Sequence, residues 1–239
     1  MTYTTDEQRW AAIEARDRGA EGAFICAVRT TGVYCLPSCS GRPLRKNVSF
    51  YDTAEAARAA GYRACLRCKP DEPRETLRWA SVDTDLGLAL AATSKAGLRV
   101  VTLGDDEAGM AADLARRFPK ARLVKDAAGL ADVLSALKTL IAAPGGALAL
   151  PLDARGSDLQ QAVWKALRDI PAGRTASYAE VARAIGRPTA FRAVAQACGA
   201  NPLAVITPCH RVVGADGRLS GYRWGVERKR ALLEREAAA

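Results

Sequence analysis

The apolar residues in the first third of the chain alternate between helical and strand-like spacing. Trp10 and Ile13 lie on one face of a helical stretch, and a charged, proline-punctuated run over residues 69–75 is typical of a linker. The pattern predicts a helix from about Thr5 to Gly19, a strand over Phe24–Val28, a turn at Thr31-Gly32 and a second helix near Thr53–Ala60. We therefore expect a first domain over residues 1–75.

Strand-like and helical runs also alternate between residues 76 and 150. The spacing predicts strands over Leu86–Ala92 and Leu98–Leu103, and helices over Glu107–Phe118 and Ala127–Ala142. This order predicts a small α/β or α+β unit. The segment carries no chemical motif of its own, so we assign it a scaffold role.

Two capping boxes mark helix starts in the third segment, residues 151–239. Ser157-Asp-Leu-Gln160 predicts a helix that runs to about Asp169. Ser177-Tyr-Ala-Glu180 predicts a second helix that ends at Gly186. In both, the hydroxyl and the Gln or Glu side chain accept hydrogen bonds from backbone N–H groups that the helix leaves free.

A third short helix is expected directly after the second. Thr189 is placed to cap a helix over Ala190–Cys198 that Gly199 would end. The connection Gly186-Arg187-Pro188 then makes the two helices a candidate helix-turn-helix, with Arg192 in the first turn of its second helix. Any two short helices can mimic this motif, so its interpretation depends on the charge around it.

The formal net charge of +9 is concentrated in this same segment. Residues 151–239 hold 14 Lys and Arg against 8 Asp and Glu, whereas the two earlier segments are nearly balanced. A basic face is often only a solvated surface. Because it coincides here with the candidate helix-turn-helix, we expect a polyanionic partner, double-stranded DNA in particular.

Composition also indicates a compartment. No apolar run is long enough to cross a bilayer, and residues 1–7 have neither the basic nor the apolar part of a secretory signal. The chain has seven cysteines, an odd number that favours free thiols and metal ligation over a disulfide framework. We expect a cytoplasmic protein and a monomer.

Four of the cysteines form two close pairs, Cys35-x3-Cys39 and Cys65-x2-Cys68. Each pair can supply one edge of a tetrahedron while the chain between them folds back, so the spacing predicts a zinc site made by Cys35, Cys39, Cys65 and Cys68. The alternative is four unrelated thiols. Cys26 falls outside the pattern, and we interpret it as a small buried apolar residue. The basic side chains close to the pairs would either reach DNA phosphates or remain solvated; they are Arg42, Arg45 and Arg67.

The run Ala-Val-Arg-Thr-Thr-Gly-Val-Tyr-Cys35-Leu-Pro-Ser-Cys39 and the run Cys65-Leu-Arg-Cys68-Lys-Pro carry a specific resemblance. They resemble the N-terminal zinc domain of the Ada adaptive-response proteins, over Phe24 to Pro70. The resemblance implies that Cys35 is both a zinc ligand and the acceptor of a methyl group from a methylated DNA phosphate. The pair of AraC-type helix-turn-helix motifs that follows this domain in full-length Ada proteins has no counterpart here.

A second candidate centre lies in residues 201–213, where Cys209 is followed by His210, the single histidine of the chain. A thiolate is the strongest nucleophile among side chains near neutral pH, and imidazole is the usual base that makes one. The alternative is a buried thiol beside a surface histidine. Because Pro202 and Pro208 fix φ and remove donors, we expect a rigid extended loop that presents Cys209, and not a helix.

Several short motifs extend this centre over the last third of the chain. They include Ile170-Pro-Ala-Gly173, Ser177-Tyr178, Asn201-Pro202, Pro208-Cys209-His210-Arg211-Val212-Val213 and the tail from Gly221 to Glu236. From about Val82 to the C-terminus the chain resembles O6-alkylguanine-DNA alkyltransferase. The resemblance implies an α+β multidomain protein. The small four-cysteine domain is then followed by a ribonuclease H-like α/β domain and a mainly helical, winged helix-turn-helix-like alkyltransferase domain.

The same resemblance assigns roles to individual residues. It implies that Cys209 accepts an alkyl group irreversibly from O6-alkylguanine, and also from O4-alkylthymine, so that each molecule reacts once. By the same resemblance His210 takes the thiol proton through a water and Glu236 orients the imidazole. The other implied roles are a brace for the loop at Asn201, a proton donor at Tyr178, a side chain that fills the gap left by a flipped base at Arg192, and a pocket lining from Tyr222 and the Val212 carbonyl. Thr207 stands where the family usually has an aliphatic residue.

Three rival functions remain open at this point. The chain could be a DNA-binding regulator whose zinc domain only senses damage, or a thiol hydrolase that uses Cys209 and His210 with turnover. In the third, the zinc domain anchors DNA and Cys35 accepts no methyl group. We favour a methylated-DNA–protein-cysteine methyltransferase that carries two acceptor cysteines.

Overall fold

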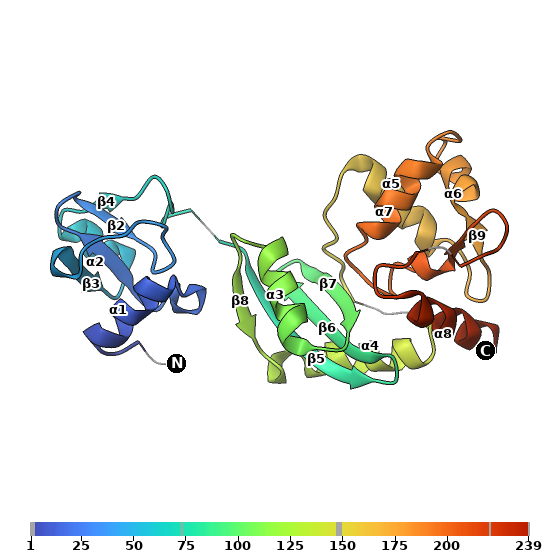
Figure 1. The fold of residues 1–239 in the computed structure, drawn as a ribbon, viewed down its shortest axis with the longest axis horizontal. Helices are drawn as coiled ribbons and strands as arrows, with labels where there is room; N and C mark the ends of the chain where they lie inside the picture. Colours follow the sequence, from blue (N-terminus) through green and yellow to red (C-terminus); the bar gives the residue numbers. More distant parts are fainter. Residues whose placement is uncertain (1–2, 73, 147–149, 220, 239) are drawn as a thin grey trace. The chain divides into compact units, whose positions relative to one another are not determined.

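A computed structural model describes residues 3–72, 74–146, 150–219 and 221–238. The chain forms two compact units (Figure 1). The first contains residues 1–75 together with residues 120–122, and the second contains the rest of the chain. Our division into three domains stays a prediction. None of the helices among the described residues combines the length and the apolar composition needed to cross a membrane.

The first unit is built on a four-stranded sheet of order β3-β1-β2-β4. The strands are β1 (Ile25–Val28), β2 (Val33–Cys35), β3 (Val48–Tyr51) and β4 (Arg63–Ala64), with helices α1 (Asp6–Ala15) and α2 (Ala54–Ala59). Strand β1 pairs antiparallel with β2 and β3, whereas β4 adds to β2 in parallel. The fully buried Phe24 ring packs against the Tyr3 and Phe50 rings at 5.9 and 5.7 Å.

The first helix is shorter than the sequence predicted. Thr5 and Gln8 form a capping box at its start, but α1 ends at Ala15 because Arg16 adopts the left-handed conformation with φ of 51°. Asp17 then accepts a hydrogen bond from the Gly19 backbone and opens a separate 3-10 turn. The predicted strand over Phe24–Val28 is confirmed as β1.

The second unit contains a sheet of order β7-β6-β5-β8. Its strands are β5 (Thr76–Thr84), β6 (Gly87–Ser94), β7 (Gly97–Gly104) and β8 (Arg122–Lys125), and its first two helices are α3 (Glu107–Arg117) and α4 (Ala131–Ala142). Leu90 of β6 packs with Met110 and Leu114 of α3, while its neighbours on the other face, such as Ala89, pack with α4. Burial on both faces explains the unbroken apolar run that predicted this strand.

The remaining helices are α5 (Asp158–Arg168), α6 (Tyr178–Ala184), α7 (Phe191–Gly199) and α8 (Val226–Ala237), accompanied by the short parallel pair β9 (Ala176–Ser177) and β10 (Val212–Val213). Their apolar faces share one core with α4 and the sheet. Inside this core Trp164 Nε1 donates to the Ala197 carbonyl at 2.8 Å, which fixes α5 against α7. The loop before Cys209 is held by the edge strand β7, because the Val101 N–H donates to the Pro202 carbonyl and the Ala204 N–H to the Val101 carbonyl.

Two local predictions in this region are wrong. The Ser157 and Ser177 capping boxes are present, but α7 begins at Phe191 with Ala190 as its N-cap, and no side chain caps it. Thr189 lies one residue too early to reach the free N–H groups of the first turn. The stretch that follows Pro208 is also not extended, since Cys209–Arg211 form one 3-10 turn.

Candidate active and metal sites

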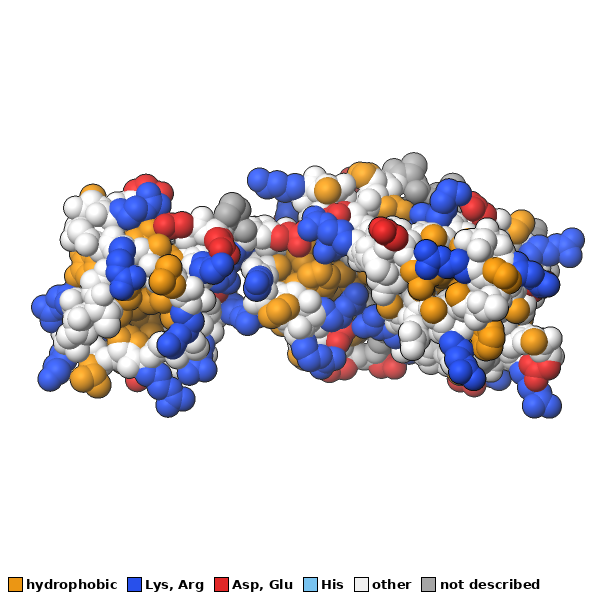
Figure 2. All heavy atoms as spheres, turned by 90° about the horizontal axis from the view of Figure 1, so that it is seen from above, with side chains coloured by type: hydrophobic (Ala, Val, Ile, Leu, Met, Phe, Trp, Pro, Cys, Tyr) orange, Lys and Arg blue, Asp and Glu red, His pale blue; other side chains and the backbone are white. Residues whose placement is uncertain are grey.

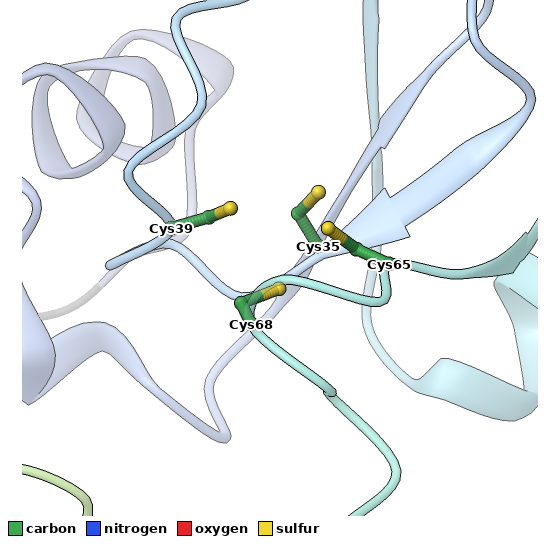
Figure 3. Close-up of side chains that lie close together, drawn as sticks. All are labelled: Cys35, Cys39, Cys65 and Cys68. Carbon is green, nitrogen blue, oxygen red and sulfur yellow. The ribbon is translucent and has the colours of Figure 1, made fainter.

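Parallel pairing of two strands brings the paired cysteines together in the first unit. Tyr34 and Ala64 are partners across the parallel strands β2 and β4. Cys35 and Cys65 are the residues that follow them along the chain, so they lie side by side where the pairing ends. The Cys65 N–H donates to the Tyr34 carbonyl at 3.0 Å. The chain then turns after each of these two cysteines and returns Cys39 and Cys68 to the same point (Figure 3).

The four sulfur atoms lie within 4.8 Å of one another and form one cluster (Figure 3). Hydrogen bonds from Cys35 and Cys68 lower the pKa of Cys39 to about 2, whereas hydrogen bonding to Cys39, burial and repulsion raise the pKa of Cys35. Four thiols this close cannot all ionise without a cation among them. Four sulfur ligands in a closed cluster are the donor set of structural zinc, so the residues fit that ion.

A cavity of about 550 Å³ lies next to this cluster, within the first unit. Cys35, Cys39 and Cys65 line it, as do Arg42 and Arg67. Arg45 does not line it. Its guanidinium lies over the Trp10 and Phe50 rings, at 5.8 and 5.1 Å from their centroids.

Cys26 also lines this cavity and lies opposite Cys35 on β1. It is buried, as expected of a small apolar residue, and burial raises the pKa of its thiol to about 12.

Cys209 lies in the second unit at the start of a 3-10 turn and is 5% exposed. The fully buried Asn201 side chain donates from Nδ2 to Cys209 Sγ at 3.2 Å and to the Thr207 carbonyl at 2.8 Å. Its Oδ1 accepts from the Leu203 N–H at 2.9 Å. One side chain thus fixes both ends of the loop and contacts the sulfur.

His210 is fully buried and bonds to Glu236 on α8, with 2.9 Å between Nε2 and Oε1. No histidine is visible on the face of the molecule in Figure 2, where Lys and Arg side chains are spread widely. Burial raises the pKa of Glu236, but hydrogen bonds with His210 and Arg211 outweigh it and bring that pKa to about 2. The carboxylate is therefore an acceptor, so Nε2 carries the imidazole proton and Nδ1 is left as an acceptor.

Two polar atoms at this site are buried and have no hydrogen-bond partner among the residues that the structure describes. They are His210 Nδ1 and the Tyr222 hydroxyl. Burial lowers the pKa of His210 and raises that of Tyr222, so both side chains are neutral near pH 7. Buried polar groups are nearly always satisfied, so atoms of this kind point to a water or a ligand.

The sequence did not single out two charged residues of this site. Arg211 donates from Nη2 to Glu236 Oε1 at 2.8 Å. Lys229 is fully buried on α8 and donates from Nζ to the Val212 carbonyl at 2.5 Å. The helical spacing Lys229, Leu232, Glu236 places all three on one buried face, and that spacing was the available signal.

Burial raises the pKa of Cys209 to about 11, against the lowering effects of Asn201 and of the Lys229 charge. The thiol therefore needs a base to become a nucleophile at neutral pH. The other predicted residues lie further out: Tyr178 is half-buried at the start of α6, and Arg192 is exposed in the first turn of α7.

Comparison with known proteins adds two family matches. The family described as 6-O-methylguanine DNA methyltransferase, DNA binding domain, matches residues 158–238, and the metal binding domain of Ada matches residues 8–71.

Relatives match nearly the whole chain or about a third of it. The bifunctional transcriptional activator/DNA repair enzyme Ada of Escherichia coli is 36% identical over 350 aligned positions, which cover 99% of this chain and 98% of the relative. The methylated-DNA–protein-cysteine methyltransferase of Mycobacterium tuberculosis is 62% identical over 85 residues, which are 36% of this chain and 52% of that protein. The crystal structure of Mycobacterium tuberculosis OGT in complex with DNA matches with a TM-score of 0.57 and 37% identity, over 67% of this chain and 93% of that one.

Proposed function

This chain belongs to the Ada family of DNA repair methyltransferases, and from that premise we propose that Cys209 accepts the alkyl group from O6-alkylguanine in double-stranded DNA. The protein repairs DNA by alkyl transfer to cysteine. The observation that supports Cys209 most directly is its hydrogen bond with Asn201, next to a His210–Glu236 pair that leaves Nδ1 free to accept. O4-alkylthymine also carries its alkyl group on an exocyclic oxygen of the base, so that a thymine anion would leave, and it is a second substrate in this proposal.

Proton transfer from the buried thiol is the first step. His210 is neutral because burial lowers its pKa, and its Nδ1 takes the Cys209 proton through a bridging water. The ionised Glu236 stabilises the imidazolium that results. The thiolate is stabilised in turn by the Asn201 amide and the Lys229 ammonium group.

Attack on the saturated carbon completes the transfer. A sulfur–carbon bond forms, the bond between that carbon and O6 breaks, and guanine leaves as an anion that Tyr178 protonates. The Tyr222 hydroxyl and the Val212 carbonyl line the base pocket, and Lys229 fixes that carbonyl. The product is a thioether that water cannot displace, so each molecule reacts once.

The nucleotide must leave the helix to reach a sulfur that is 5% exposed. In this proposal α6 and α7 are the helix-turn-helix of a winged helix-turn-helix-like domain, with α7 in the minor groove and Arg192 in the gap. The preceding sheet with α3 and α4 is the ribonuclease H-like domain. We expect a cytoplasmic monomer, in keeping with seven cysteines of which none forms a disulfide.

The first unit holds one zinc site, at Cys35, Cys39, Cys65 and Cys68. Zinc keeps its sulfur ligands as thiolates without a protein base. The second part of the proposal is that Cys35 accepts a methyl group from a methylated DNA phosphate held in the adjoining cavity by Arg42 and Arg67. Arg45, which is exposed, contacts the phosphates outside the cavity.

Peptide mass spectrometry after incubation with methylated duplex DNA tests both parts. We expect one methyl group on Cys209 with O6-methylguanine DNA and one on Cys35 with a methylphosphotriester. A regulator that only senses damage would leave both peptides unmodified. A thiol hydrolase would instead release more product than one equivalent per protein.

A further inference from the structure

An exposed aromatic side chain lies at the start of α7. Phe191 is 46% exposed, and among the described residues only three other large apolar side chains are exposed: Leu44, Leu66 and Leu152. The Arg192 guanidinium lies over the Phe191 ring, 5.8 Å from its centroid. The two neighbours thus present a planar cation and an aromatic ring side by side.

The chain around Phe191 favours contact with a polyanion. Residues 181–215 contain no Asp or Glu, and Arg183, Arg187 and Arg192 are exposed within that span. The exposed face of α7 continues with Ala195, Gln196 and Gly199, which are small or uncharged. Nothing on this face repels a phosphate backbone or holds it at a distance.

We propose that Phe191 is a wedge that enters the base stack of duplex DNA beside the nucleotide extruded toward Cys209. This inference rests on the proposed function, since it needs α7 to lie against DNA. Apolar side chains inserted between base steps unstack and open a duplex, and an aromatic ring gains stacking in return. Arg192 fills the vacated position, while Phe191 covers the exposed face of the neighbouring base.

The wedge acts on extrusion and not on sulfur chemistry, because Phe191 lies on the surface and Cys209 is buried. Loss of one base–aromatic stack corresponds to roughly a tenfold change in an equilibrium. Removal of the ring is therefore expected to slow repair of duplex DNA about tenfold, and to leave reaction with a free base unchanged.

The test compares Phe191→Ala with the unchanged protein on two substrates. One is a duplex that contains O6-methylguanine; the other is O6-benzylguanine as a free base. We expect about tenfold slower alkylation of Cys209 from the duplex, with an unchanged free-base rate. Phe191→Trp keeps the duplex rate of the unchanged protein, and so does Leu152→Ala, a matched exposed apolar residue of the same unit.

Equal duplex rates for Phe191→Ala and the unchanged protein would overturn the wedge. An equal loss with the free base would overturn it too, because it would indicate a disturbed fold. If the unchanged protein reacted with neither substrate, the proposed function itself would be refuted. The failure of the wedge and the failure of the proposed function are therefore distinguishable.

Discussion

The two proposed acceptor cysteines lie in opposite chemical settings. Around Cys35 three further sulfur atoms crowd within 4.8 Å, and the cluster has no imidazole base among its ligands. Around Cys209 lie an amide donor, a buried ammonium group and a His–Glu pair. The first setting depends on a cation held by the thiols, and the second on polar groups that the fold places around one thiol.

This difference has a structural consequence. The zinc cluster is made by two short turns at one sheet edge, so it needs little surrounding core. The Cys209 site draws on α7, the following loop, α8 and the edge of β7, so it needs a packed domain around it. The two chemistries should therefore be separable by mutation, metal removal and pH.

Replacing each acceptor cysteine in turn should separate the two reactions, and it is expected to change their rates the most. Cys209→Ser should abolish methyl transfer from O6-methylguanine, since a serine hydroxyl ionises far less readily than a thiol, and should leave zinc content at one equivalent. Cys35→Ser should abolish transfer from the phosphotriester and leave the guanine reaction unchanged. Peptide mass spectrometry and zinc analysis measure both. Residual guanine repair in Cys209→Ser would refute the assignment of the acceptor.

Removal of zinc is expected to have the second largest effect. Zinc binding contributes on the order of 10 kcal/mol to small domains of this kind, so a strong chelator should unfold the first unit and expose Trp10. The Cys209 reaction with a free base should continue at its original rate. Limited proteolysis reports the unfolding, and a trypsin-resistant first unit in the chelated protein would contradict the prediction.

Replacing Glu236, the carboxylate that bonds to His210, tests the Cys209 site alone. Glu236→Gln should slow alkylation of Cys209 by roughly 10²-fold, because the imidazolium loses its counter-charge and Arg211 loses its buried partner. Glu234→Gln, an exposed neighbour on the same helix, is the matched control and should change little. Single-turnover kinetics on duplex DNA measure the rates. A normal rate in Glu236→Gln would remove the His–Glu pair from the mechanism.

The smallest expected effect is on pH dependence. Burial lowers the pKa of His210 below its usual 6.5, so the base stays neutral and the rate should hold constant down to pH 6.5 and fall only below it. The unfolded chain takes up that proton first as the pH falls, so the stability linked to His210 is present above 6.5 and declines below it. A rate profile on free O6-benzylguanine, together with thermal unfolding, checks both. A midpoint above pH 6.5 would show that the imidazole is not the buried group described here.

Local sequence signals predicted part of this structure well. The Ser157 and Ser177 capping boxes involve residues three apart, and the cysteine pairs are three or four apart, so short-range geometry decides both. The same reasoning missed β5, in which exposed Arg78 and Asp83 interrupt the apolar pattern, because pairing with β6 is what stabilises that strand. It also predicted Thr189 as the N-cap of α7, whereas the N-cap is the next residue, Ala190.

The sequence by itself determined the donor set for zinc, the adjacency of Cys209 and His210, and the concentration of positive charge in the last third, since each is a matter of residue type and short spacing. The family resemblance implied that Glu236, 26 residues further on, orients His210, but only the tertiary structure shows how the two side chains come into contact and that Lys229 is buried. The physical reason is that burial sets the pKa values of Cys209 and His210, and burial is a property of packing between distant segments. Spacing identified the reactive groups, and packing determined their protonation.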